Sequence, residues 1–274
     1  ERVSGDKVRG KPERFAEHYS QATLFWNSQT PVEKAHIVRA FRFELTKVAV
    51  PAVRERVVSM LANVASELAQ AVAQGLGMAL PQPMPRALLI TPQPEVLQSP
   101  PLSLLYRPGD GSIRGRRVAI LVVDGVDGEG VRALHAGLLG QGAVPRLVGA
   151  RLGAAASESG DAVQVEVTLE TTPSVLYDAV VVPDGKRAAM LLGKLGHALE
   201  FIKDQYRHCK PILALGAGAD LLDDAGVPAR LPSGGEDSGL ILVNTGDTER
   251  ALALFVAAIA GHRHYARETD PPPV

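Results

Sequence analysis

Residues 117–124 read RVAILVVD, and this unbroken apolar run decides the fold of the second half of the chain. Comparable runs follow at 143–150, 177–185, 210–218 and 239–244. Strands without polar alternation are typical of a parallel sheet that helices cover on both faces. The sequence therefore predicts an α/β architecture for this half of the chain.

The segments between these runs carry helical patterns. We expect helices at 128–141, 187–206 and 219–225, and a last helix that runs from an Asp247 N-cap to about His262. The variable stretch after the second run favours short strands. Strands alternating with helices in this order indicate parallel pairing with crossover connections.

A different pattern precedes the sheet. Thr30, the proline after it and Glu33 predict a helix start, because together they form a capping box with proline in the first turn. Apolar positions then recur at helical spacing: Ile37, Phe41 and Leu45. A second helix is predicted from Pro51 to Gly75. Its apolar stripe consists of Val53, Val57, Met60, Leu61, Val64, Leu68 and Val72.

Three stretches lack a sustained period. Residues 1–29 carry apolar side chains without a helix or strand pattern, and we expect them to contact a surface outside this chain. Residues 79–115 are dense in proline and predict an extended linker that wraps a surface. The tail 265–274 is polar and proline-rich, so we expect it to fray. The predicted divisions are therefore 1–78, the linker 79–115, an α/β domain at 116–264 and the tail 265–274.

The composition argues against several classes of protein. Lys+Arg 29 against Asp+Glu 30 give a net charge of -1, which favours neither nucleic acid nor an anionic membrane as partner. The longest apolar run near the end, 251–260, is too short for a membrane span, which needs about 20 residues. Cys209 is the single cysteine, so no intrachain disulfide can form and we expect a reducing, cytoplasmic compartment. The charged opening ERVSGDK predicts no secretion signal, and without an initiator Met we expect a piece of a longer protein.

The helical segment resembles a known family. Residues 14–48, RFAEHYSQATLFWNSQTPVEKAHIVRAFRFELTKV, followed by VPAVRERVV at 50–58, are similar to the end of the core in large-subunit haem catalases of the hydroperoxidase II type. The order of helical pair, proline-rich linker and flavodoxin-like domain is also that family's. The resemblance implies a parent enzyme that dismutates hydrogen peroxide to water and oxygen on a buried haem, as a cytoplasmic homotetramer that protects against oxidative stress.

The resemblance also implies that the haem-binding residues lie upstream of this chain. In that family the proximal tyrosine follows an arginine by four residues, and none of the tyrosines here does: Tyr19, Tyr106, Tyr177, Tyr206 and Tyr265. The letters RALHAG at 132–137 are similar to the distal Arg-x-x-His-Ala motif, but they fall in the first helix of the α/β domain. We interpret His135 as an ordinary helical histidine. The chain alone is predicted to bind no cofactor and to be inactive.

The α/β domain also resembles the DJ-1/PfpI branch of the class I glutamine amidotransferase-like fold. Those enzymes carry a nucleophilic cysteine and then a histidine at a sharp turn from strand to helix, where the helix N-terminus lowers the thiol pKa. Gly216 and Ala217 stand at these two positions, so we predict a vacated nucleophile elbow and no catalytic residue. Cys209 lies seven residues too early, and Glu129 falls only loosely near the family's glutamate.

The sequence patterns for dinucleotide, phosphate and metal sites are incomplete. Gly216-Ala217-Gly218 lacks the third glycine of a dinucleotide fingerprint, because Leu221 takes its place. The glycine-rich loop 124–130 carries three carboxylates, which repel phosphate. His208 with Cys209, or His262 with His264, could hold a metal, although such spacing is common by chance and we predict no metal site.

Two classes of function remain open. The first is an accessory region of a haem catalase that serves subunit stability, assembly and access to a haem held by upstream residues, with the core of the same polypeptide as partner. The alternative is a chaperone-like or ligand-binding accessory domain. An independent hydrolase of the DJ-1/PfpI type ranks third, because of Gly216 and Ala217.

Overall fold

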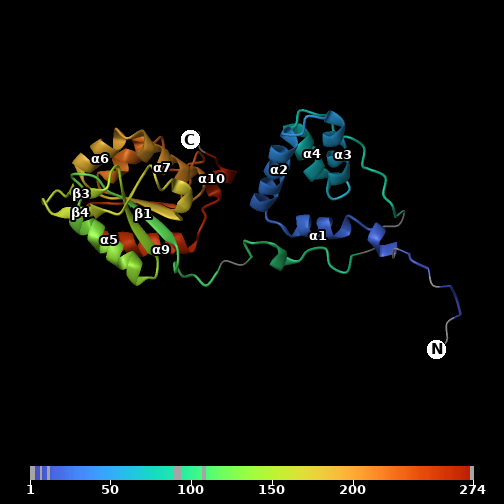
Figure 1. The fold of residues 1–274 in the computed structure, drawn as a ribbon, viewed down its shortest axis with the longest axis horizontal. Coiled ribbons are helices and arrows are strands. Elements are labelled where there is room, and N and C mark those ends of the chain that lie inside the picture. Colours follow the sequence, from blue (N-terminus) through green and yellow to red (C-terminus); the bar gives the residue numbers. More distant parts are fainter. Residues whose placement is uncertain (1–3, 7, 11–12, 89–93, 107–108, 272–274) are drawn as a thin grey trace. The chain divides into compact units, whose positions relative to one another are not determined.

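The chain folds as two compact units, Glu1–Pro108 and Gly109–Val274, called here the helical unit and the α/β unit (Figure 1). The computed structural model describes residues 4–6, 8–10, 13–88, 94–106 and 109–271.

The α/β unit is built around a six-stranded parallel sheet in the order β5-β2-β1-β6-β7-β8. Its strands are β1 (Arg117–Leu121), β2 (Val144–Gly149), β5 (Val167–Thr168), β6 (Ala179–Val182), β7 (Ile212–Leu215) and β8 (Leu240–Val243). Every residue of β6 and β7 is buried, as expected for strands covered on both faces. The predicted flavodoxin-like α/β fold is confirmed.

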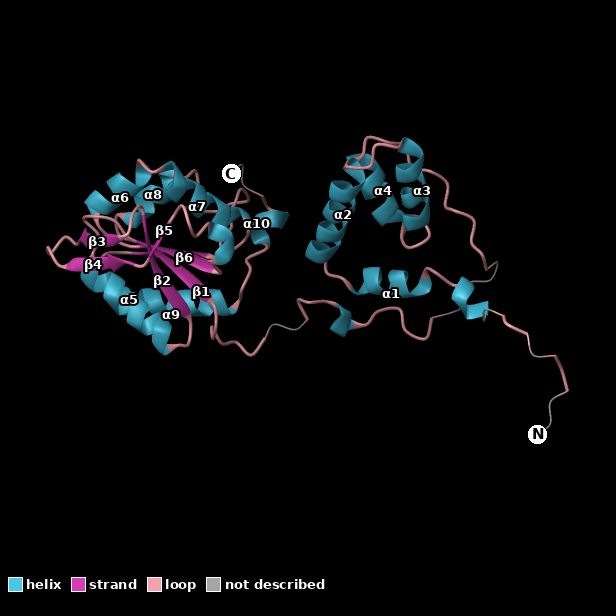
Figure 2. Cartoon of the chain, viewed as in Figure 1, coloured by secondary structure: helices cyan, strands magenta, loops and turns pink. Residues whose placement is uncertain are grey.

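Helices cover both faces of this sheet, as Figure 2 shows. The helices on one face are α5 (Gly128–Gly140) and α9 (Thr248–Ala260). Those on the other face are α6 (Lys186–Gly193), α7 (Gly196–Arg207) and α8 (Gly218–Asp224). A small antiparallel pair, β3 (Gly153–Ala156) and β4 (Ala162–Val165), follows β2, and η3 (Ser174–Leu176) precedes β6.

One predicted helix of the α/β unit is wrong in its length. The helix expected at 187–206 is divided into α6 and α7, with Lys194 and Leu195 between them. Gly193 and Gly196 flank this break, and glycine is the poorest helix former after proline because it loses the most backbone entropy.

The helical unit contains α1 (Ser20–Ser28), α2 (Pro31–Thr46), α3 (Pro51–Leu61) and α4 (Ser66–Gly75), with short turns η1 (Glu13–Ala16) and η2 (Pro100–Leu102). The predicted capping box of Thr30 and Glu33 is confirmed. The expectation that 1–29 forms no helix is wrong, because α1 lies there and its Trp26 is buried. The Trp26 indole donates to the Glu67 carboxylate at 2.7 Å, a contact between distant segments that local periodicity does not reveal.

The helix predicted from Pro51 to Gly75 is divided as well, into α3 and α4. The four residues between them reset the helical phase, so the predicted apolar stripe is only partly buried. Leu68 and Val72 are buried, whereas Val53 and Met60 are 40% and 42% exposed.

The proline-rich stretch contacts the helical unit at two places. The Ser59 hydroxyl donates to the Gln82 carbonyl, and the Asn63 amide donates to the Met84 carbonyl. Farther along, Ser103 and Leu104 donate to the Glu33 carboxylate. These contacts belong to the part of the stretch within the helical unit, whereas Ile113 near its end is buried in the core of the α/β unit. Residues 89–93 and 107–108 lie outside the described residues.

The carboxyl-terminal tail does not fray as predicted. Residues Ala266–Thr269 form the short helix α10, and Arg267 is buried. The prediction failed because polarity was taken as a sign of solvation, whereas this arginine has a buried partner, Asp237. Residues 272–274 lie outside the described residues.

Candidate functional site

The elbow predicted after β7 is a sharp turn in the structure. Gly216 directly follows β7 with a positive φ of 46°, and Ala217 leads into α8. The Gly216 N–H donates to the Val243 carbonyl at 2.9 Å, which ties the turn to β8. The structure thus places both predicted residues at the carboxyl edge of the sheet, where ligands bind in open α/β folds.

A carboxylate occupies the space beside this turn. A Cβ built on Gly216 would overlap the Asp184 side chain, which comes from the loop after β6. One Asp184 oxygen accepts from the Ala217 N–H at 2.8 Å and from the Gly185 N–H at 2.7 Å. A larger side chain at position 216 therefore has no room while Asp184 is in place.

Asp184 is held as an anion. Burial by itself raises the pKa of this carboxyl, but hydrogen bonds from Thr245, Ala217 and Gly185 and the nearby Lys186 outweigh it, so its pKa lies below the usual range. Sequence reasoning missed Asp184, although a carboxylate two residues after a buried strand is a recognisable signal.

The crevice between β1 and β6, where the strand order reverses, is closed by backbone. The Asp127 N–H donates to the Asp184 carbonyl at 2.9 Å, and a Cβ on Gly185 would overlap the Gly125 carbonyl. The Asp127 carboxylate accepts from the N–H groups of Glu129 and Gly130 at the start of α5. These are the donors that a phosphate needs at a helix N-terminus, and the chain's own carboxylate occupies them.

The remaining predicted residues do not converge on the elbow. Cys209 lies at the opposite end of β7 and is fully buried, and burial raises its thiol pKa to about 11. Glu129 is exposed in the first turn of α5, and His135 is half-buried on the same helix. Neither position brings a nucleophile or base to Gly216.

The histidines considered as metal ligands have other partners or face solvent. His262 lies 3.6 Å from the Asp178 carboxylate, His264 is hydrogen-bonded to Ser238 at 2.8 Å, and His208 is exposed. Among the residues that the structure describes, no three His, Cys, Asp or Glu side chains are grouped to hold a metal ion.

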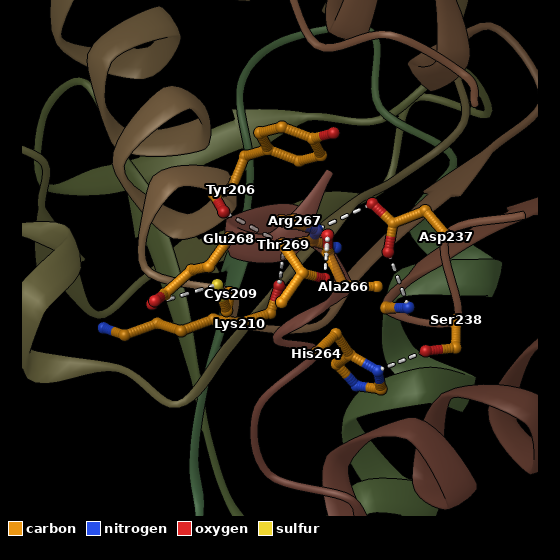
Figure 3. A network of polar contacts seen from close by, with 11 residues as sticks. Tyr206, Cys209, Lys210, Asp237, Ser238, His264, Ala266, Arg267, Glu268 and Thr269 are labelled. Atoms are coloured by element: carbon orange, nitrogen blue, oxygen red, sulfur yellow. Dashed lines mark hydrogen bonds and ion pairs between the residues drawn. The ribbon is translucent and has the colours of Figure 1, made fainter. Parts of the chain in front are cut away.

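A buried ion pair lies at the centre of a polar network in the α/β unit (Figure 3). The Arg267 guanidinium lies 2.6 Å from the Asp237 carboxylate, and both side chains are almost fully buried. Arg267 also donates to the carbonyls of Tyr206 and Lys210 and stacks over the Tyr206 ring. The network attaches α10 to α7 and to the segments that precede β7 and β8, so we interpret it as a structural anchor for the carboxyl-terminal segment.

Three tyrosines in the described part of the chain do not fit the role of a haem ligand. A tyrosinate ligand needs a phenol that opens into a cavity with a cation nearby. Tyr177 and Tyr206 are 2% and 1% exposed inside the α/β core. Tyr19 does line a cavity of about 260 Å³ together with Arg86, but no histidine lines that cavity to act on peroxide.

Comparison with known proteins decides the family. The model for the C-terminal domain found in long catalases matches residues 114–269, and the catalase-related immune-responsive family matches 12–76. The chain belongs to the family of long-catalase C-terminal domains. Its match to both models confirms the predicted resemblance to the end of a large, hydroperoxidase II type catalase.

Several catalases are similar to this chain and are much longer than it. The chain is 40% identical to catalase HPII of Mycobacterium avium over 286 residues, which is 100% of this chain and 39% of that protein. It is 37% identical to catalase HPII of Pseudomonas putida and 35% identical to catalase-2 of Bacillus subtilis, covering 98% and 97% of this chain and 36% of each relative. The chain thus spans less than two fifths of the length of these relatives and corresponds to their C-terminal part. None of the described helices is long and apolar enough to cross a membrane.

Proposed function

We propose that this chain is the accessory region of a haem catalase, with its helical unit seated on a core formed by the same polypeptide. Its role is to stabilise and assemble the subunit and to shape access to a haem that other residues hold. The parent reaction is the dismutation of hydrogen peroxide, and the parent is a homotetramer.

The exposed apolar surface of the helical unit carries this proposal. Large apolar side chains are exposed along most of the unit: Phe15, Phe25, Phe43, Val50, Val53, Met60, Leu80, Val96, Leu97, Leu102, Leu104, Leu105 and Tyr106. Its buried core is small by comparison: Trp26, Leu45, Val58, Leu61, Leu68, Ala69, Val72 and Ala73. A surface of this kind marks a region that another protein surface covers.

The closed elbow supports an accessory role over an independent hydrolase. Nucleophilic catalysis needs a nucleophile and a base within hydrogen-bond reach, and Gly216 and Ala217 supply neither. Asp184 fills the adjacent space, so no substrate atom can approach the turn from that side.

The accessory role is tested in the full-length catalase. We expect Phe43→Ser, at a side chain 64% exposed in this chain, to accelerate thermal inactivation of the tetramer severalfold and leave kcat unchanged. The matched control is Leu152→Ser, a 63% exposed apolar side chain of the α/β unit, which should inactivate like the wild type. If both variants and the wild type inactivate at the same rate, the exposed apolar surface of the helical unit does not stabilise the tetramer.

The absence of haem chemistry is tested on the 274-residue chain itself. With one equivalent of hemin we expect no saturable Soret band and no oxygen evolution above that of free hemin. A one-to-one Soret band, with oxygen evolution that disappears in His135→Ala, would show that the chain holds a haem of its own.

A further inference from the structure

A cavity of about 210 Å³ lies at the carboxyl edge of the sheet, beside β1 and β2 and away from the closed elbow. Residues that follow β1 and β2 form part of its wall, and β3, β4, α6 and the connection from α6 to α7 contribute the rest. Figure 1 shows β3 and β4 next to β1 at this edge of the α/β unit. Loops at this edge of a parallel sheet are the usual place for ligands in open α/β folds.

The floor of the cavity is apolar. Val122 is fully buried at the end of β1, Ala155 comes from β3, and Val165 comes from β4. Leu191 and Leu195 close the side that faces α6 and α7. The lining residues all belong to the α/β unit, and those on β3, β4 and α6 are held by regular secondary structure.

Two opposite charges line the cavity. Arg151 follows β2 and is exposed, and among the described residues its guanidinium has no hydrogen bond or ion pair. Asp124 follows β1, and one of its oxygens accepts from the Ala156 N–H at 2.9 Å. Arg151 is therefore the available cation, whereas Asp124 holds β3 in place and adds one negative charge.

We propose that this cavity binds a small organic monoanion, a carboxylate with a compact apolar body such as an aromatic or branched ring or chain. The apolar body lies on Val122, Ala155 and Val165, and the carboxylate pairs with Arg151, whose planar fork suits it. The volume is below the roughly 300 Å³ at which sites for drug-sized ligands begin, so the body is small. Asp124 repels a second negative charge, which disfavours dianions such as phosphate monoesters.

The test uses benzoate as the probe and the full 274-residue chain, followed by amide NMR. We expect saturable shifts at residues 122–124 and 150–155, and weaker binding of benzamide, the neutral molecule of the same shape. Arg151→Gln should weaken benzoate roughly fivefold, the effect of losing one exposed ion pair, and leave benzamide unchanged. Ala154→Leu, at an exposed lining position, should abolish binding of both.

The matched control is Arg146→Gln. Arg146 lies on β2 outside the cavity and pairs with Glu166 at 3.6 Å, so benzoate should bind this variant like the wild type. Thermal melts establish that each variant is folded. The proposal fails if no saturable shifts occur at these amides, if benzamide binds as tightly as benzoate, or if Arg151→Gln binds benzoate like Arg146→Gln.

Discussion

At the scale of single residues, one carboxylate decides the chemistry of the elbow. Asp184 takes the space that a side chain at Gly216 would need, and it accepts the N–H of Ala217. In a nucleophile elbow such a turn exposes a reactive side chain. Here the turn carries no such side chain, and its Ala217 N–H is hydrogen-bonded to Asp184. Substitutions at Asp184 therefore act on stability.

We expect Asp184→Asn to lower the free energy of unfolding by about 1.5 kcal/mol at pH 7, because hydrogen bonds to a charged acceptor are replaced by neutral ones. The folded state lowers the pKa of this carboxyl. Its contribution is therefore complete above the ordinary value of about 3.9 and is lost as the pH falls through the lower folded value. Denaturant titrations followed by circular dichroism at several pH values measure this difference. A difference in unfolding free energy between the wild type and Asp184→Asn that increases toward acid pH would contradict the assignment of Asp184 as a stabilising anion.

Gly239 is expected to tolerate no side chain. A Cβ there would lie 2.5 Å from the His264 ring and 2.6 Å from the Arg267 guanidinium, inside the network of Figure 3. We expect Gly239→Ala to destabilise the α/β unit by roughly 1–3 kcal/mol through overpacking. Gly235→Ala is the control in the same loop, because its Cβ would meet only the Ser233 hydroxyl at 3.3 Å. Equal melting temperatures for the two variants would show that the network rearranges around the added methyl group at little energetic cost.

At the scale of elements, Glu33 joins a helix to the linker. Its carboxylate caps α2 through Thr30 and accepts from the Ser103 hydroxyl and the Leu104 N–H, each at 2.8 Å. Burial raises the pKa of Glu33, but these hydrogen bonds outweigh it and the net pKa is lowered. A single capping residue thus holds a segment some 70 positions away in the chain.

We expect Glu33→Gln to release this part of the linker, because a neutral amide has one acceptor oxygen in place of two charged ones. Chymotrypsin should then cleave near Leu104 and Tyr106 severalfold faster than in the wild type. Glu44→Gln is the control on the same helix, since that carboxylate pairs with the exposed Lys47 alone among the residues that the structure describes. Identical cleavage of both variants would mean that other contacts retain the linker.

At the scale of the whole molecule, the two units differ in autonomy. The α/β unit encloses a contiguous core between its sheet and its helices, whereas the helical unit has a smaller core and leaves more large apolar side chains exposed. The sequence-based boundaries 116–264 remain a prediction, and they omit Ile113 and Arg267, which are both buried. The structure therefore favours wider limits for an autonomous fragment.

We expect a fragment of residues 109–271 to melt cooperatively as a monomer and to bind a hydrophobic dye less than the full chain. A fragment of 116–264 should melt on the order of 10 °C lower, because Asp237 is left as an unpaired buried charge at a cost of about 3–5 kcal/mol. Differential scanning calorimetry of both fragments measures this shift. Trp26, the single tryptophan, reports separately on the helical unit in the full chain. Equal melting temperatures for the two fragments would show that Arg267 does not anchor the carboxyl-terminal segment.

The sequence by itself determined the features that depend on near neighbours. The apolar run at 117–124 and its repeats predicted the parallel sheet, and Thr30 with Glu33 predicted the start of α2. Periodicity and capping depend on residues a few positions apart, so they can be recognised from the sequence alone. The breaks that divide two predicted helices are also local, and Gly193 with Gly196 offered the signal for one of them.

Only the tertiary structure decided which distant groups meet. Asp184 reaches a turn 33 positions later, and Arg267 pairs with Asp237, 30 positions earlier in the chain. The sequence marked Gly216 and Ala217 as lacking catalytic groups, but it gave no sign that a carboxylate fills the gap. Nor did it show that a polar tail is anchored in the core. Partners between separate elements depend on how the layers pack, and a charge is stable inside a protein only where packing brings its counter-charge.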